Sequence, residues 1–213
     1  MEILYADATL LVASKPPRVL STDEPGGMPD LLRQALGDPA ANVRTVHRLD
    51  RVVGGAMVFA RTKRAARELS AQITDGGFGK RYLAVVHGAP TPPAGRMEDE
   101  LWRDKARRMT FAVPTPGPET QHAALDYRTL ATQQGKSLVA VSLLTGRTHQ
   151  IRVQLSERGF PLVGDVKYGG PRCGDGLKLH AVRLRVGEET YTALPPWAGP
   201  WRVAHLPPEW EDV

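Results

Sequence analysis

Short apolar segments alternate with turns rich in glycine and proline along most of the chain, and this pattern limits the fold more than any other feature. Of the 213 residues, 21 are Gly and 18 are Pro, and both residue types interrupt long helices and central strands. Segments rich in valine, leucine and tyrosine between such turns are typical of β-strands. We predict strands at residues 3–5, 10–13, 55–60, 80–87, 123–131, 137–144, 177–186 and 190–194, and a hairpin over 97–113.

Two segments carry the signals of a helix. The first helix begins near Pro29, because proline is tolerated in the first turn. The second begins at Thr62, whose hydroxyl can cap it, and ends at Gly76, with an apolar face formed by Ala65, Leu69 and Ile73. Residues 148–159 fit either a helix capped by Thr148 or a strand in which Ile151, Val153 and Leu155 alternate. The elements together predict an α+β protein with a large, mostly antiparallel sheet and two or three helices.

Length and cysteine content favour a single domain in a reducing compartment. A typical domain has roughly 100–200 residues, so we expect one compact domain over residues 1–213. The single cysteine, Cys173, has no intrachain partner for a disulfide, which favours the cytoplasm. The first residues are acidic and no signal-peptide core follows them. No apolar run approaches the roughly 18–20 residues that span a membrane.

Positive charge is concentrated in one part of the chain. Residues 44–108 contain 14 Lys and Arg against 7 Asp and Glu, a net charge of +7. The other residues carry a net charge of −2, and the whole chain +5. A polyanion such as a nucleic acid is one partner that fits this distribution, and an ordinary solvated basic face is the other interpretation.

Motifs for common cofactors are absent from the sequence. No Gly-x-x-x-x-Gly-Lys-Ser/Thr phosphate loop occurs, and the glycines of residues 169–176 do not form a dinucleotide fingerprint. The six histidines lack the spacing of a structural zinc site. A reaction without cofactor or metal is therefore favoured, although a metal on His47 and Asp50 stays open.

The first motif with chemical content is His-Arg-Leu-Asp-Arg at residues 47–51. Asp50 has Arg48 and Arg51 as near neighbours, and nearby positive charge keeps a carboxylate in its ionised, nucleophilic form. The alternative is a surface loop with an ordinary ion pair.

The second motif is Gly-Arg-Thr-His-Gln-Ile-Arg-Val-Gln-Leu at residues 146–155. Cationic, amide and hydroxyl donors alternate there with apolar anchors. Such a segment can bind phosphates while one arginine points inward to a buried carboxylate.

Three motifs of this chain resemble those of the RluA family of RNA pseudouridine synthases, and they follow one another in the same order as in that family. Two are the motifs above, the second continuing to Gly164-Asp165, and the third is Lys-Arg-Tyr-Leu-Ala-Val-Val-His-Gly at residues 80–88. The opening residues 3–17 and the segment 177–186 are also similar to the family. The resemblance implies a pseudouridine synthase fold with a large, mixed, mainly antiparallel sheet flanked by a few helices. It also implies a cytoplasmic monomer that isomerises a uridine to pseudouridine in structured rRNA or tRNA without a metal or cofactor.

The same resemblance implies a role for individual residues. Asp50 is the expected catalytic aspartate, Tyr82 is expected to stack on the target base, and Arg152 to pair with the aspartate. Arg48 is expected to help fill the place that the base leaves, and RNA is expected to contact Arg48, Arg51, Arg147 and His149. The chain has Val52-Val53-Gly54 where many members have Thr-Ser-Gly, so a loop hydroxyl is lost. The motifs begin at residue 3, and we therefore expect no accessory N-terminal RNA-binding domain.

Two other functions fit parts of the pattern. One is an RNA-binding protein without activity, although binding alone would not require a carboxylate that repels phosphate. The other is a metal-assisted phosphodiesterase that uses His47, Asp50 and His149.

Overall fold

The computed structural model describes residues 1–206 and 210. The chain divides into two compact units, Met1–Lys80 with His180–Pro195, and Arg81–Leu179 with Pro196–Val213. The chain passes from the first unit to the second within β5 (Phe78–His87) and returns within β10 (Leu179–Val186). The single domain expected over residues 1–213 stays a prediction.

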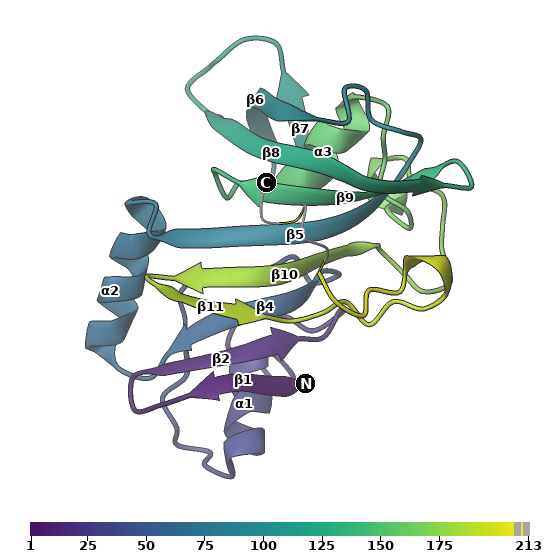
Figure 1. Ribbon diagram of the computed structural model, residues 1–213. Helices are drawn as coiled ribbons and strands as arrows, with labels where there is room; N and C mark the ends of the chain where they lie inside the picture. The colour runs from purple at the N-terminus through teal and green to yellow at the C-terminus, as the bar shows by residue number, and fades with distance from the viewer. Residues whose placement is uncertain (207–209, 211–213) are drawn as a thin grey trace. The chain divides into compact units, whose positions relative to one another are not determined.

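The first unit is a mixed sheet. Its strands are β1 (Glu2–Ala6), β2 (Leu10–Lys15), β3 (Arg44–Thr45), β4 (Gly54–Ala60), β10 and β11 (Glu189–Thr192). They follow the order β1-β2-β4-β10, with β3 paired to β4 and β11 to β10 (Figure 1). The β4–β10 pair is parallel, and the other pairs of this unit are antiparallel.

Two helices pack in the first unit, close to where the sequence predicts them. They are α1 (Met28–Leu36) and α2 (Lys63–Thr74). The Thr62 hydroxyl accepts a hydrogen bond from the Ala65 amide at 3.0 Å, as the capping signal predicts. Every residue of β4 is buried, which explains its uninterrupted apolar run. The core that includes β4 and α2 consists of Val12, Ala56, Val58, Ala60, Ala65, Leu69, Phe78, Leu184, Val186 and Ala193.

The second unit is built on a run of long strands. Besides β5 they are β6 (Ala94–Asp104), β7 (Met109–Val113), β8 (Thr120–Gln133) and β9 (Lys136–Leu143). Their order is β5-β9-β8-β6-β7 (Figure 1). The β6–β7 pair is the hairpin predicted over residues 97–113, and β8 pairs antiparallel with both β6 and β9.

The ambiguous segment 148–159 forms a helix, α3 (Gln150–Glu157). All residues from 150 to 155 are buried, so burial does not alternate as it would in a half-exposed strand. Val153 packs with Leu101, Ala123 and Tyr168 in the core of this unit. The expected cap is wrong, because the N-cap position is His149 in a left-handed conformation (φ 57°) rather than Thr148. Two short 3-10 helices, η1 (Val166–Tyr168) and η2 (Gly199–Trp201), complete the described elements.

The α+β class and the mainly antiparallel, mixed strand pairing are confirmed. Three α-helices accompany the strands in the described part of the chain. Among these residues, no helix combines the length and the apolar character needed to cross a membrane.

Gly55 permits the close approach of β4 and β10. Its φ of 128° lies in the region that favours glycine, and an added Cβ would lie 2.2 Å from the Ala181 carbonyl oxygen. We expect Gly55→Ala to lower the free energy of unfolding by about 1–3 kcal/mol or more, measured by urea denaturation. Gly174→Ala is the control, because a Cβ there meets nothing within 4 Å. Equal stability of the two variants would contradict the tight β4–β10 contact.

Candidate active site

The loop that carries Asp50 connects β3 to β4 in the first unit and is anchored on both sides of the aspartate. Before it, the Ser21 hydroxyl donates to the Leu49 carbonyl at 2.8 Å and accepts from the Leu49 amide at 3.1 Å. The Val53 amide donates to the Asp50 carbonyl at 2.9 Å, which closes a turn. Leu49 and Val53 are buried, whereas Asp50 is half-buried. The backbone is therefore held while the carboxylate stays at the edge of the unit's interior.

The residues after Asp50 are held by the segment that follows β2. The Arg51 carbonyl accepts a hydrogen bond from the Arg18 amide at 2.6 Å and another from the Lys15 ammonium at 3.2 Å. In return, the Arg51 guanidinium donates through Nε to the Arg18 carbonyl at 3.1 Å. The side chains of Arg48 and Arg51 are exposed on either side of Asp50. The loop thus presents two cations and one carboxylate on a fixed backbone.

His47 anchors the start of this loop as a neutral side chain. Its Nε2 accepts a hydrogen bond from the Val58 amide at 3.1 Å, and its ring meets Phe78 edge-on at 5.0 Å. Burial, with the nearby Lys80 as a smaller cause, lowers the pKa of His47 to about 3. Because Nε2 accepts, the proton of the neutral ring is on Nδ1, and neither nitrogen offers a lone pair to a metal.

The hydrogen bond at Nε2 counts against His47 as a metal ligand. Both metal-dependent alternatives need this histidine: the metal site with Asp50 and the phosphodiesterase with Asp50 and His149. Over residues 1–206 and 210, no group of three or more His, Cys, Asp or Glu side chains is arranged to hold a metal ion.

In the second unit, Arg152 forms a buried ion pair with Asp165. Nε lies 2.7 Å from Oδ2 and Nη2 lies 2.7 Å from Oδ1, so the contact is bidentate. The side chains are only 6% and 1% exposed. The guanidinium carbon also lies 5.0 Å from the centre of the Tyr168 ring. The inward-pointing arginine expected in residues 146–155 is therefore confirmed. Its side chain contacts the carboxylate of Asp165.

The sequence did not predict Asp165 as the partner of Arg152. Gly164-Asp165 lies in the continuation of the second motif, but nothing in the sequence linked its carboxylate to Arg152. The Asp165 contact uses Nε and Nη2 of the arginine. The expected pairing of Arg152 with Asp50 joins residues of different units and stays a prediction.

His149 is tied to the same cluster. Its Nδ1 lies 2.7 Å from the Tyr168 hydroxyl, which also accepts a hydrogen bond from the Thr110 amide at 2.9 Å. Burial is the main cause that raises the pKa of Tyr168, so the hydroxyl is protonated near neutral pH. His149 is half-buried, and its expected contact with RNA stays a prediction.

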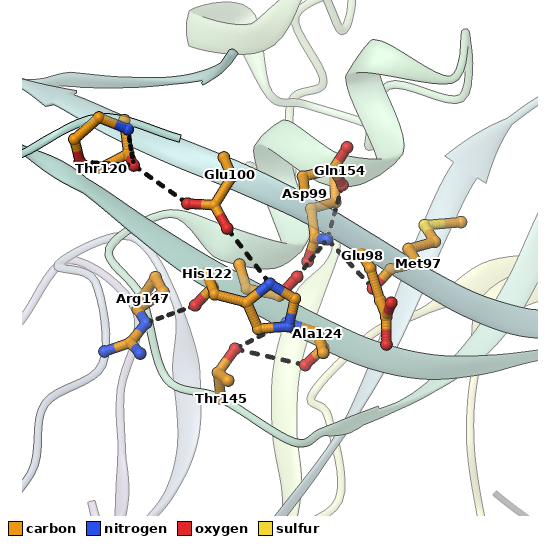
Figure 2. A network of polar contacts seen from close by, with 12 residues as sticks. Met97, Glu98, Asp99, Glu100, Thr120, His122, Ala124, Thr145, Arg147 and Gln154 are labelled. Carbon is orange, nitrogen blue, oxygen red and sulfur yellow. Dashed lines mark hydrogen bonds and ion pairs between the residues drawn. The ribbon is translucent and has the colours of Figure 1, made fainter. Parts of the chain in front are cut away.

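Arg147 is the more accessible cation of this motif. It is exposed, its Nε donates to the His122 carbonyl at 2.9 Å, and its amide donates to Oε1 of Gln150 at 3.0 Å. Figure 2 shows the far end of its guanidinium pointing away from His122, whose ring is paired with Glu100 at 3.4 Å. Arg147 is thus held at one nitrogen in a way that suits contact with a phosphate.

Tyr82 is the remaining predicted site residue. It lies on β5 in the second unit and is 6% exposed. Within this unit, Tyr82 lies on β5, Arg147 and His149 lie in the segment just before α3, and Arg152 lies in the first turn of α3. Arg48, Asp50 and Arg51 share one loop of the first unit.

Comparison with known proteins identifies the family. The family model described as RNA pseudouridylate synthase matches residues 9–157. The chain is 35% identical over 207 residues to ribosomal large subunit pseudouridine synthase D of Neisseria meningitidis, a match that covers 86% of this chain and 54% of that protein. It is 32% identical over 192 residues to the uncharacterized RNA pseudouridine synthase YlyB of Bacillus subtilis, covering 85% and 62% respectively.

A solved structure agrees with these matches. Human RNA Pseudouridylate Synthase Domain Containing 1 superposes with a TM-score of 0.78 at 26% identity, over 92% of this chain and 82% of that chain. The chain belongs to the RNA pseudouridylate synthase family, and its resemblance to the RluA group is confirmed. The chain thus spans only 54% and 62% of the lengths of these two curated relatives.

The buried Arg152–Asp165 pair leads to a stability prediction. Asp165→Asn replaces the carboxylate of this buried bidentate pair with a neutral amide, which we expect to cost about 3–5 kcal/mol of unfolding free energy in urea titrations. Asp126→Asn is the matched control, because its pair with Arg96 is also bidentate but is 54% and 32% exposed. That variant should cost no more than about 1 kcal/mol. Similar losses in the two variants would contradict a special role of burial at Asp165.

The buried histidines of the first unit predict a loss of stability in acid. Burial lowers the pKa of His47 to about 3 and that of His180 to about 4, whereas an unfolded chain has values of about 6.5. Between these values the unfolded state binds protons that the native state does not. The free energy of unfolding should therefore fall as pH drops below about 6.5, approaching about 1.4 kcal/mol per pH unit for each histidine.

Urea titrations at pH 7.5, 6.5 and 5.5 measure this dependence. His47→Gln keeps an acceptor for the Val58 amide but cannot take up the proton, so its pH dependence should be weaker. His205→Gln, at an exposed position, should keep the full dependence. If His47→Gln leaves the pH dependence of the unfolding free energy unchanged, the lowered pKa of His47 is not a cause of the loss of stability in acid.

Proposed function

We propose that this chain converts a uridine of structured RNA to pseudouridine, with Asp50 as the catalytic carboxylate. The proposal rests mainly on one observation: in this member of the family, Asp50 lies on a loop whose backbone is held by hydrogen bonds at Leu49 and at Arg51. Ribosomal RNA is the first substrate to test, because relatives are named for the large ribosomal subunit. Transfer RNA is the second.

The reaction breaks the C–N glycosidic bond, turns the uracil and joins its C5 to C1′ of the ribose. Nothing is oxidised or reduced, so the chemistry needs an ionised carboxylate near the sugar and a means of retaining the detached base. The carboxylate can begin by attacking C1′, by attacking the ring or by removing a sugar proton. Each route uses the same ionised group at Asp50.

The target base has to leave its stack before it reacts, which costs a few kcal/mol. Stacking on an aromatic ring returns roughly 1–3 kcal/mol per base, and we assign this role to Tyr82. Arg48, whose side chain is exposed, has the planar cation that can fill the gap in the RNA. Arg51, Arg147 and His149 are proposed to bind the surrounding RNA, and Arg152 is proposed as a further residue of the active site.

Asp50→Asn is the direct test of the activity. We expect it to bind RNA with a Kd within roughly threefold of the natural chain, because phosphate contacts dominate affinity. Pseudouridine formation should fall to background, since the amide cannot act as a nucleophile or base. The substrate is total RNA from cells that lack the gene, and pseudouridine mapping reads the product and its position.

Asp75→Asn is the matched control, since it removes a carboxylate from an exposed helix end within the same basic part of the sequence. It should keep normal activity. Full activity of Asp50→Asn would refute the catalytic assignment. A natural chain that modifies neither rRNA nor tRNA would refute the proposed reaction as a whole, and RNA binding without product would favour the inactive binding protein.

A further inference from the structure

Lys15 is a fully buried lysine at the end of β2. Its ammonium donates to three backbone carbonyls, at 3.0 Å to Pro16, 2.7 Å to Val19 and 3.2 Å to Arg51. Two of these acceptors belong to the turn that follows β2. The third, Arg51, is the residue directly after Asp50 and lies 36 positions away in the chain. One side chain thus connects a strand end to the loop of the proposed catalytic aspartate.

The three acceptors match the donors of a protonated lysine. An ammonium has three N–H donors, one for each carbonyl, whereas a neutral amide has two. Removing an ammonium from water costs several kcal/mol, so a buried charge has to be offset by hydrogen bonds and by an interaction with another charge. The carboxylate of Asp50 acts on Lys15 and favours its charged form.

The contacts around Lys15 also fix the position of the aspartate. The Arg51 carbonyl takes the Lys15 ammonium and the Arg18 amide together, while Ser21 holds both backbone groups of Leu49. In the sheet register, Lys15 lies opposite Gly55 on β4, just beyond the end of the Asp50 loop. Lys15 therefore acts at the point where the loop returns to the sheet.

We propose that Lys15 is a positioning residue for Asp50: its ammonium holds the loop at the Arg51 carbonyl, directly after the aspartate. The inference rests on the proposed function, since it assumes that Asp50 is the catalytic group. It assigns a role to a residue that does not itself touch the uridine.

The charge of Lys15 is open to titration within the range of an enzyme assay. Burial lowers its pKa to about 8, against the opposing effect of Asp50. His180 on β10 also interacts with Lys15, but burial lowers its pKa to about 4, so it is neutral above pH 6. The guanidinium groups of Arg18 and Arg51 keep their charge in this range. A decline of the rate above pH 8 would then report the loss of the Lys15 charge.

Three substitutions separate charge from hydrogen bonding. Lys15→Arg keeps the charge, Lys15→Gln keeps a donor without charge, and Lys15→Met removes both. The full chain is assayed from pH 6 to 9 on its RNA, with single-turnover rates for the chemical step and a separate RNA Kd. Lys136→Gln, on β9 of the second unit, controls for the loss of a lysine charge elsewhere.

We expect Lys15→Gln and Lys15→Met to lower the single-turnover rate roughly 10- to 100-fold at pH 7, with the RNA Kd within roughly threefold. The natural chain should lose rate above pH 8, and Lys15→Arg should not. A Lys15→Gln rate equal to that of the natural chain would overturn the proposal. If the uncharged variants do not fold, the comparison of the natural chain with Lys15→Arg decides: the same alkaline decline in both, or none in the natural chain, overturns it.

Failure of this inference is distinguishable from failure of the proposed function. If the natural chain forms pseudouridine, Asp50→Asn does not, and Lys15→Gln is fully active, only the role of Lys15 is wrong. If Asp50→Asn is fully active, the catalytic assignment itself is wrong, and the role of Lys15 falls with it.

Discussion

The attachment of the Asp50 loop to the segment after β2 is the constraint on which the proposed chemistry depends. A carboxylate can act on a sugar only if its backbone keeps it in place, and the aspartate itself is half-buried rather than packed. Hydrogen bonds at Leu49 and Arg51 hold the two residues beside it. The parallel approach of β4 to β10 at Gly55 then fixes where the loop ends.

Buried charge is used in each unit, but the partners differ. In the second unit, Arg152 has a bidentate carboxylate partner in Asp165, together with the ring of Tyr168. In the first unit, the Lys15 ammonium donates to three carbonyls and is attracted by the negative charge of Asp50. A charge removed from water is costly unless it is paired and hydrogen-bonded. In each unit, the partners of the buried cation therefore offset the cost of removing its charge from water.

Local patterns predicted most of the secondary structure. The Thr62 cap, the hairpin over residues 97–113 and the strands on either side of residues 7–9 all form where the sequence indicates them. Residues 148–159 were ambiguous because the same apolar spacing fits a helix and a strand. Packing on both sides decides that case, since every residue from 150 to 155 is buried and burial overrides a weak local preference.

The sequence alone determined the chemical types at the proposed site: a carboxylate between arginines, a tyrosine in a strand and an arginine that points inward. These follow from residues that are neighbours in the chain or belong to one continuous motif. Only the tertiary structure decided which groups support them. Lys15 reaches Arg51 over 36 positions, and Ser21 reaches Leu49 over 28. Such contacts have no local signal, because they exist only once the strands are paired and the loops are brought together.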